Sequence, residues 1–192
     1  MIYHYSICVN FRVGLFIFIL KNRSCSRRTD ANIMQRRVLH QTHMACISRC
    51  GASETTTHLF LHCDIFGSLW PYIWRWLQIS LVIPADIRQF FIQFIHMPGL
   101  PRFTHSFLKV IWFAYVWVLW KKRNNRVFQN LVSDPSTTVE YVKLHSFLWL
   151  KSKHANFSFS YHDWWKHPLL CMGVHDLVNT FWCFTSCTPY VG

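Results

Sequence analysis

The stretch CISRCGASETTTHLFLHC, residues 46–63, decides how the rest of the chain is interpreted, because it gathers three cysteines and two histidines in eighteen positions. Four of these residues, Cys46, Cys50, His58 and Cys63, have the spacing C-x3-C-x7-H-x4-C. Structural zinc sites use four tetrahedral ligands, and thiolate sulfur and imidazole nitrogen are the donors that zinc prefers. The spacing therefore predicts one zinc ion bound by these four side chains.

The local sequence also predicts how the ligands approach one another. Gly51 directly follows Cys50 and permits the backbone conformation of a tight turn. Threonines at positions 55–57 can cap a helix that carries the second pair of ligands. His58 and Cys63 are five residues apart, which does not suit one face of a straight helix, and His62 is an alternative fourth ligand. Four protein ligands leave no coordination position for water, so we expect a structural metal rather than a catalytic one.

Composition limits the class of protein. The chain has 192 residues, a hydrophobic content of 52% and a formal net charge of +12, from 20 Lys and Arg against 8 Asp and Glu. This length allows one domain, or one domain with a small module, and the hydrophobic content is too high for a disordered chain. The positive charge favours a polyanionic partner such as nucleic acid, although solvated surface charge explains it equally simply.

No segment predicts secretion or a membrane span. The first twenty residues lack a basic start, and Arg12 interrupts their apolar pattern. The apolar run at residues 110–120 has about half the length of a spanning helix, so we expect a buried core helix, with an interfacial helix as the alternative. We therefore expect no membrane partner, an intracellular location in the nucleus or cytoplasm, and reduced cysteines that bind metal before they form disulfides.

The hydrophobic pattern predicts a mainly α protein, a small helical domain built around a structural zinc knuckle and followed by a helical extension. Apolar residues at positions 59–77 fall on one helical face, which Pro71 should kink or interrupt. Pro84 and Asp86 open a second helix, and residues 104–128 form the longest one. Asp134 and Pro135 have the pattern of an N-cap followed by proline at the first helical position.

We divide the chain into four parts. Residues 1–22 form an apolar helical segment, 23–80 the zinc-binding domain, 81–153 the helical extension and 154–192 an irregular tail rich in aromatic residues and cysteine. The tail contains a second, looser group of cysteines and histidines: His167, Cys171, His175, Cys183 and Cys187. This group is either a second metal site or a set of unpaired thiols.

Basic residues surround the predicted zinc site. Residues 21–49 contain seven Lys or Arg and one acid. Zinc with three thiolates and one imidazole carries about one negative charge, so part of this surplus neutralises the site. We expect the following to contact phosphates of single-stranded RNA or DNA: Lys21, Arg23, Arg36, Arg37 and Arg49. The tryptophans at positions 70, 74 and 76 are either part of this surface or, as is usual at helical spacing, core residues.

The sequence shows no motif of an enzyme. It lacks a phosphate-binding P-loop, a G-x-S-x-G nucleophile elbow and a zinc-protease H-E-x-x-H. Its eight acidic residues are scattered, whereas two-metal nucleotidyl transfer needs clustered carboxylates. We therefore expect no catalytic activity and no small-molecule substrate.

Residues 46–70, CISRCGASETTTHLFLHCDIFGSLW, resemble the zinc-binding domain found C-terminal to the reverse transcriptases of plant non-LTR (LINE-type) retrotransposons. The shared pattern is a cysteine pair, glycine, an acidic-Thr step, HLF, a cysteine and a tryptophan. The upstream KNRSCSRRTDANIMQRRVLH, the downstream VIWFAYVWVLWKKRNNRVFQN and DWWKHPLLCMG near the end are also similar to that family.

The resemblance implies that His58, rather than His62, is the ligand. It also implies a nucleic-acid-binding accessory module of a reverse transcriptase, with the polymerase domain as a further partner and without polymerase activity of its own. The chain departs from the family in having C-x3-C where C-x2-C is commoner. It also contains no aromatic-x-Asp-Asp step, which is a signature of the polymerase domain. The alternatives are a zinc-stabilised protein–protein interaction module and a non-functional remnant of a retroelement.

Overall fold

The computed structural model describes residues 45–174, in which helices are joined by turns and irregular loops and one isolated bridge pairs Ala45 with Ser53. The prediction of a mainly α fold, with the Cys-rich segment before the helices, is confirmed for this part of the chain. In chain order the elements are the π-helical turn η1 (His58–His62), the 3-10 turn η2 (Gly67–Leu69), α3 (Trp70–Leu77), α4 (Ile87–Ile95), the 3-10 turn η3 (Arg102–Thr104), α5 (His105–Gln129), α6 (Pro135–Lys153), α7 (Tyr161–Lys166) and α8 (Pro168–Cys171).

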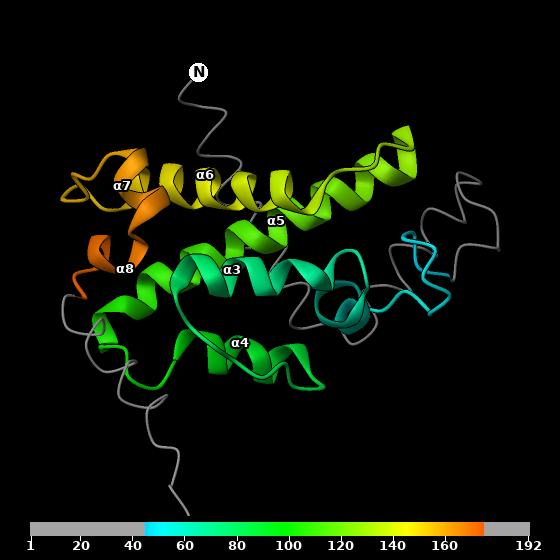
Figure 1. The fold of residues 1–192 in the computed structure, drawn as a ribbon, viewed down its shortest axis with the longest axis horizontal. Helices are drawn as coiled ribbons and strands as arrows, with labels where there is room; N and C mark the ends of the chain where they lie inside the picture. The colour runs from blue at the N-terminus through cyan, green and yellow to red at the C-terminus, as the bar shows by residue number, and fades with distance from the viewer. Residues whose placement is uncertain (1–44, 175–192) are drawn as a thin grey trace, which may run out of the picture.

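Helix α5 is the centre of the fold. It runs behind α3, with α6 along one side of it and α4 on the other (Figure 1). Nine of its residues are buried, so it is the core helix that the apolar run predicted. Among the described helices, only the stretch Arg102–Gln129 is long and apolar enough to cross a membrane by length and composition. Of the 18-residue segment of this stretch that meets the criterion, 56% is buried inside the protein.

The starts of α4 and α6 follow the predicted capping chemistry. The Asp86 carboxylate accepts hydrogen bonds from the main-chain N–H groups of Arg88 and Gln89, at 2.7 and 3.2 Å. The Asp134 carboxylate accepts one from the N–H of Thr137 at 3.1 Å, and Pro135 occupies the first turn of α6. Both aspartates satisfy N–H groups that have no partner inside the helix, which fixes where each helix begins.

The helical pattern of residues 59–77 is interrupted earlier than Pro71. The chain turns between Cys63 and Gly67, and Pro71 lies in the first turn of α3, where a missing N–H removes no helical hydrogen bond. Gly67 explains the position of the break, since a Cβ atom there would lie 2.4 Å from the carbonyl oxygen of Leu61. Only glycine allows the two backbone segments to approach so closely.

The tail predicted to be irregular contains two short helices in its described part. The Ser160 hydroxyl accepts a hydrogen bond from the Asp163 N–H, and the Asp163 carboxylate accepts one from the Ser160 N–H, which makes a capping box at the start of α7. Trp164 is fully buried and donates its indole N–H to the Ser146 hydroxyl of α6 at 3.0 Å. This tryptophan anchors α7 to α6.

One hydrophobic cluster extends from Cys46 to Val174. Trp70 lies at its centre, fully buried, with its ring centroid 4.1 Å from that of Tyr115 and 4.7 Å from that of Phe90. Trp76 is also buried, so Trp70 and Trp76 are core residues, which is one of the two alternatives that the sequence left open. The predicted domain boundaries at residues 80 and 153 stay predictions, and the segment 1–22 lies outside the described residues.

Candidate metal centre

The structure brings the four predicted ligands together. The ligand atoms of Cys46, Cys50, His58 and Cys63 all lie within 4.8 Å of one another. The Sγ atoms of Cys46 and Cys63 are 3.8 Å apart, and the distance from Cys50 Sγ to His58 Nε2 is 3.2 Å. A tetrahedral zinc site with Zn–S bonds of about 2.3 Å has S–S edges of about 3.8 Å, whereas a disulfide bond is about 2.05 Å long. The cluster can hold one metal ion, and its donor set is the one that zinc prefers.

The first two ligands come from a tight turn. The N–H of Cys46 donates to the carbonyl of Ala52, and the N–H of Arg49 donates to the carbonyl of Cys46, both at 2.8 Å. Arg49 and Gly51 have positive φ angles of 65° and 83°. The extra residue of C-x3-C is thus accommodated by a left-handed backbone conformation at Arg49. Gly51 adopts a second left-handed conformation, as its position after Cys50 predicted.

The π-helical turn η1 brings the other two ligands to the same side. The N–H of Cys63 donates to the carbonyl of His58 at 2.7 Å, five residues back, and the Thr55 hydroxyl accepts from the N–H of His58 at 3.0 Å. In an α-helix a separation of five residues would place the two side chains about 140° apart around the axis. The wider π turn reduces this angle. His62 is exposed and lies outside the cluster, so the four side chains that come together include His58 and not His62.

Ser48 completes the centre. Its hydroxyl is buried and lies 3.2 Å from the sulfur atoms of both Cys46 and Cys63. Hydrogen bonds from the Ser48 hydroxyl and the Ala52 main chain lower the pKa of Cys50 to about 6, whereas burial raises the pKa of Cys46 to about 11. When a cation is bound and both sulfur atoms are thiolates, the single Ser48 hydroxyl proton would donate to one of them at a time and orient it.

The core supports η1 through one carbonyl group. The carbonyl oxygen of Phe60 accepts a hydrogen bond from the Trp70 indole at 2.9 Å and another from the Tyr115 hydroxyl at 2.8 Å. Burial raises the pKa of Tyr115 well above its usual value, so this hydroxyl stays protonated and able to donate. Two side chains of the core therefore fix the turn that positions His58 and Cys63.

The cysteine turn is also joined to the last turns of α5. The Arg123 guanidinium forms an ion pair with the Glu54 carboxylate at 2.5 Å, and the N–H of Ile47 donates to the same carboxylate at 3.2 Å. Arg126 donates to the carbonyl of Ser48 at 3.4 Å. The ligand-bearing turn is thereby held against a basic helix end that lies sixty to eighty residues later in the chain.

The predicted phosphate contacts are only partly covered by the structure. Arg49 is exposed beside Cys50, and the other four, Lys21, Arg23, Arg36 and Arg37, lie outside the described residues. Of the proposed second metal group, Cys171 is a buried free cysteine, His167 is exposed and the other members lie outside the described range. Within residues 45–174, no metal-binding group of three or more residues is found apart from the cluster described above.

Four residues that build the centre were not predicted from the sequence: Ser48, Glu54, Tyr115 and Arg123. Ser48 has a weak sequence signal, a hydroxyl two residues after a ligand cysteine. Tyr115 has another, since it brings a polar group into the apolar run of α5. The Glu54–Arg123 pair has none, because nothing local relates positions so far apart.

Comparison of the chain with protein-family models, with curated proteins and with solved structures found no match.

Proposed function

We propose that this chain is a zinc-stabilised module that binds single-stranded nucleic acid and has no catalytic activity. The observation that carries the proposal is the convergence of three cysteine sulfurs and one histidine nitrogen within 4.8 Å. Four protein ligands close a tetrahedral site, so a bound zinc would hold the turn of residues 46–53 against η1 rather than activate water. The resemblance to retrotransposon reverse transcriptases supports the nucleic-acid partner, with a polymerase domain as a further partner.

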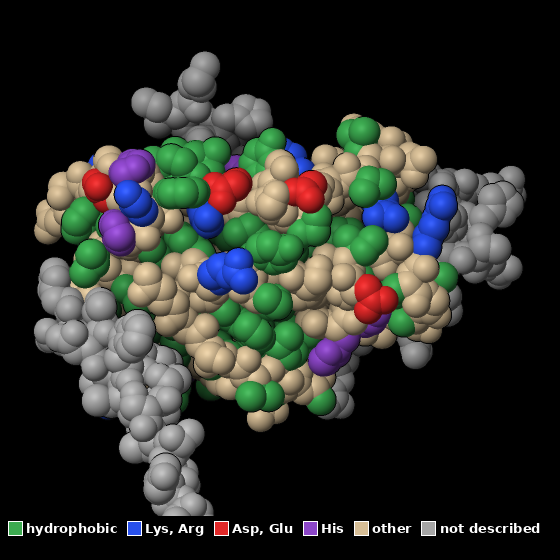
Figure 2. All heavy atoms as spheres, viewed as in Figure 1, with side chains coloured by type: hydrophobic (Ala, Val, Ile, Leu, Met, Phe, Trp, Pro, Cys, Tyr) green, Lys and Arg blue, Asp and Glu red, His purple; other side chains and the backbone are tan. Residues whose placement is uncertain are grey.

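The charge around the centre also supports a polyanionic partner. Arg49 is exposed in the turn beside Cys50, and Lys121 is exposed on α5. Figure 2 shows basic side chains at the end of the molecule that carries the Cys-rich segment. Glu54, the acid nearest the turn, is already paired with Arg123. Arg49, next to the candidate ligand Cys50, thus remains available for phosphate groups.

The metal is tested by measuring zinc per chain in the wild type and in Cys50→Ser. We expect close to one zinc per chain, lost in Cys50→Ser together with part of the helical signal, because structural zinc contributes directly to folding. Cys171→Ser is the matched control, since it removes a buried thiol that lies outside the cluster. Zinc retained in Cys50→Ser, or lost equally in Cys171→Ser, contradicts the site.

The nucleic-acid partner is tested with the zinc-loaded protein and short single-stranded oligonucleotides at increasing salt. Each phosphate contact contributes about −0.7 to the slope of log K against log salt concentration for a single strand. We expect a steep slope in the wild type and a smaller one in Arg49→Gln and Lys121→Gln. Binding that does not depend on salt, or no binding, contradicts the proposal.

A second candidate is a protein–protein interaction module. Phe128 in the last turn of α5 is 61% exposed, and Leu131 and Val132 just after the helix are 53% and 71% exposed. Large apolar side chains exposed so close together are typical of contact surfaces. Self-association that is abolished by Leu131→Ser, without any oligonucleotide binding, would favour this candidate.

A further inference from the structure

A shallow groove of about 300 Å³ lies between α3, α6 and α7, away from the metal centre. On this face hydrophobic, basic and acidic side chains lie side by side over α3 and α6 (Figure 2). Its aromatic and basic lining residues are Tyr72, Arg75, Trp76, Lys143, Trp165 and Lys166, and its one acidic lining residue is Glu140.

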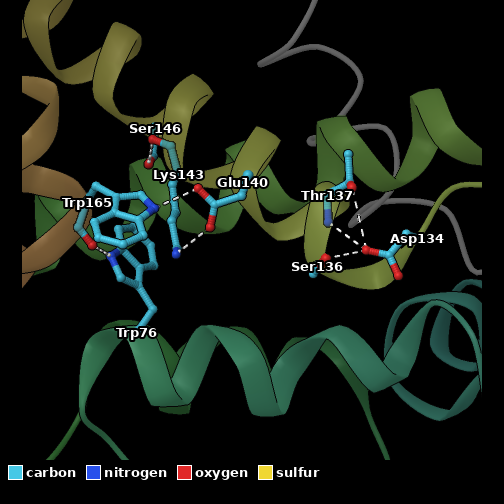
Figure 3. Close-up of polar contacts among 8 residues, drawn as sticks. All are labelled: Trp76, Asp134, Ser136, Thr137, Glu140, Lys143, Ser146 and Trp165. Carbon is cyan, nitrogen blue, oxygen red and sulfur yellow. Dashed lines mark hydrogen bonds and ion pairs between the residues drawn. The ribbon is translucent and has the colours of Figure 1, made fainter.

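The exposed indole in the groove is held in place. Trp165 is 41% exposed, and its Nε1 donates to the Glu140 carboxylate at 2.7 Å. Its carbonyl oxygen accepts a hydrogen bond from the Trp76 indole at 3.0 Å. Figure 3 shows Glu140 and Lys143 of α6 extending toward these two tryptophans. One hydrogen bond thus orients the Trp165 indole and the other holds its main chain, and an aromatic surface held in this way loses little conformational entropy when a flat ligand stacks on it.

Lys143 has a structural role in this arrangement. It forms an ion pair with Glu140 at 2.6 Å, and its ammonium group lies 5.0 Å from the ring centroid of Trp165. Its charge is therefore already balanced by Glu140 and by the indole face.

Two further cations give the groove its net charge. Arg75 and Lys166 are exposed and form no ion pair with any residue in the described part of the chain. Together with the balanced Lys143–Glu140 pair they leave the groove with a net charge of about +2. An exposed aromatic ring bordered by unpaired cations suits a ligand that combines a flat ring with negative charge.

We propose that this groove binds one unpaired nucleotide of a single strand, with the base against Trp165 and Tyr72 and the phosphate near Arg75 and Lys166. The inference rests on the proposed nucleic-acid function and gives it a specific site. Because every base has a stacking face, the groove is expected to bind with little sequence preference.

The test is a titration of the zinc-loaded full chain with two labelled oligonucleotides of equal length, an oligo-uridine and the same backbone without bases. Trp165→Ala should weaken binding of the oligo-uridine by roughly 5- to 100-fold and change binding of the abasic strand little. Trp165→Phe retains a ring and should recover most of the affinity. Arg75→Gln should weaken the binding of both strands.

Two variants are matched controls. Phe159→Ala removes an aromatic side chain of similar exposure, 38%, and Lys153→Gln removes an exposed charge, both outside the groove. If the wild type binds but Trp165→Ala behaves like Phe159→Ala, the groove is overturned while the proposed function stands. If the wild type binds neither strand, both proposals are overturned.

Discussion

The hydroxyl of Tyr115, in the middle of α5, lies 2.8 Å from the carbonyl oxygen of Phe60, in the turn between the candidate metal ligands His58 and Cys63. Trp70 donates to the same oxygen. This contact joins the buried centre of the helical core to the element that carries His58 and Cys63. We therefore expect the stability of the core and the geometry of the metal centre to be coupled.

Replacing Tyr115 with phenylalanine tests this coupling. The ring remains packed against Trp70, and only the hydroxyl is lost. We expect the free energy of unfolding to fall by about 1 kcal/mol, because Phe60 keeps one of its two donors. Zinc affinity should fall as well, since η1 is held less firmly. Urea unfolding and competition with a chelator measure the two effects, and Tyr141→Phe, at an exposed position of α6, should change neither. A Tyr115→Phe protein with unaltered zinc affinity would disprove the coupling.

The two histidines of η1 give the sharpest test of the ligand set. His58 Nε2 lies 3.2 Å from Cys50 Sγ, whereas His62 is exposed. We expect His58→Ala to lose most of its zinc, because three ligands bind a structural zinc far less tightly than four. His62→Ala should keep the full metal content. Absorption spectra of the cobalt-substituted proteins report the ligand geometry directly, and a reversed outcome would make His62 the ligand.

The ion pair between Glu54 and Arg123 should stabilise the centre from outside. The Glu54 side chain is only 11% exposed and also accepts from the N–H of Ile47. We expect a coupling free energy of about 1–2 kcal/mol in a double-mutant cycle of Glu54→Gln and Arg123→Gln, because both partners are largely shielded from water. Both single variants should bind zinc more weakly than the wild type. Additive effects of the two substitutions would show that the pair does not hold the turn.

The capping box of α7 should make part of the stability depend on pH. Hydrogen bonds from the Ser160 hydroxyl and main chain lower the pKa of Asp163 below its usual value. A lowered pKa in the folded state contributes stability above the unfolded value, and this contribution is lost as the pH falls through the folded value. Asp163→Asn should therefore be less stable than the wild type at neutral pH, and the difference should shrink below about pH 4.

The difference between the two proteins isolates this effect, since Asp163 lies outside the metal cluster and we expect any loss of metal at low pH to be the same in both. Asp64→Asn is the control, because its exposed carboxylate has no hydrogen-bond partner among the described residues. Thermal unfolding at several pH values measures the difference. A stability gap between Asp163→Asn and the wild type that is constant with pH would rule out a role for the charge.

Local chemistry was sufficient for much of this protein. Donor types and spacing indicated a four-ligand group of three cysteines with His58 or His62, and the family resemblance implied His58; the structure brings Cys46, Cys50, His58 and Cys63 together. Asp86 and the Asp134–Pro135 pair located the starts of α4 and α6, because a cap acts on N–H groups only two or three residues away. The long apolar run predicted the core helix α5, because the apolar character of a helix is contained in its own residues.

The tertiary structure decided what depends on residues that are distant in sequence. Helical periodicity placed His58 and Cys63 on different faces, and the π turn η1 brings them to the same side. Trp70 and Tyr115 hold this turn through the carbonyl of Phe60, which they follow by up to fifty-five residues. The Glu54–Arg123 ion pair and the aromatic groove at Trp165 also join segments that no local pattern relates. The sequence determined the donors, and long-range packing determined the geometry in which they meet.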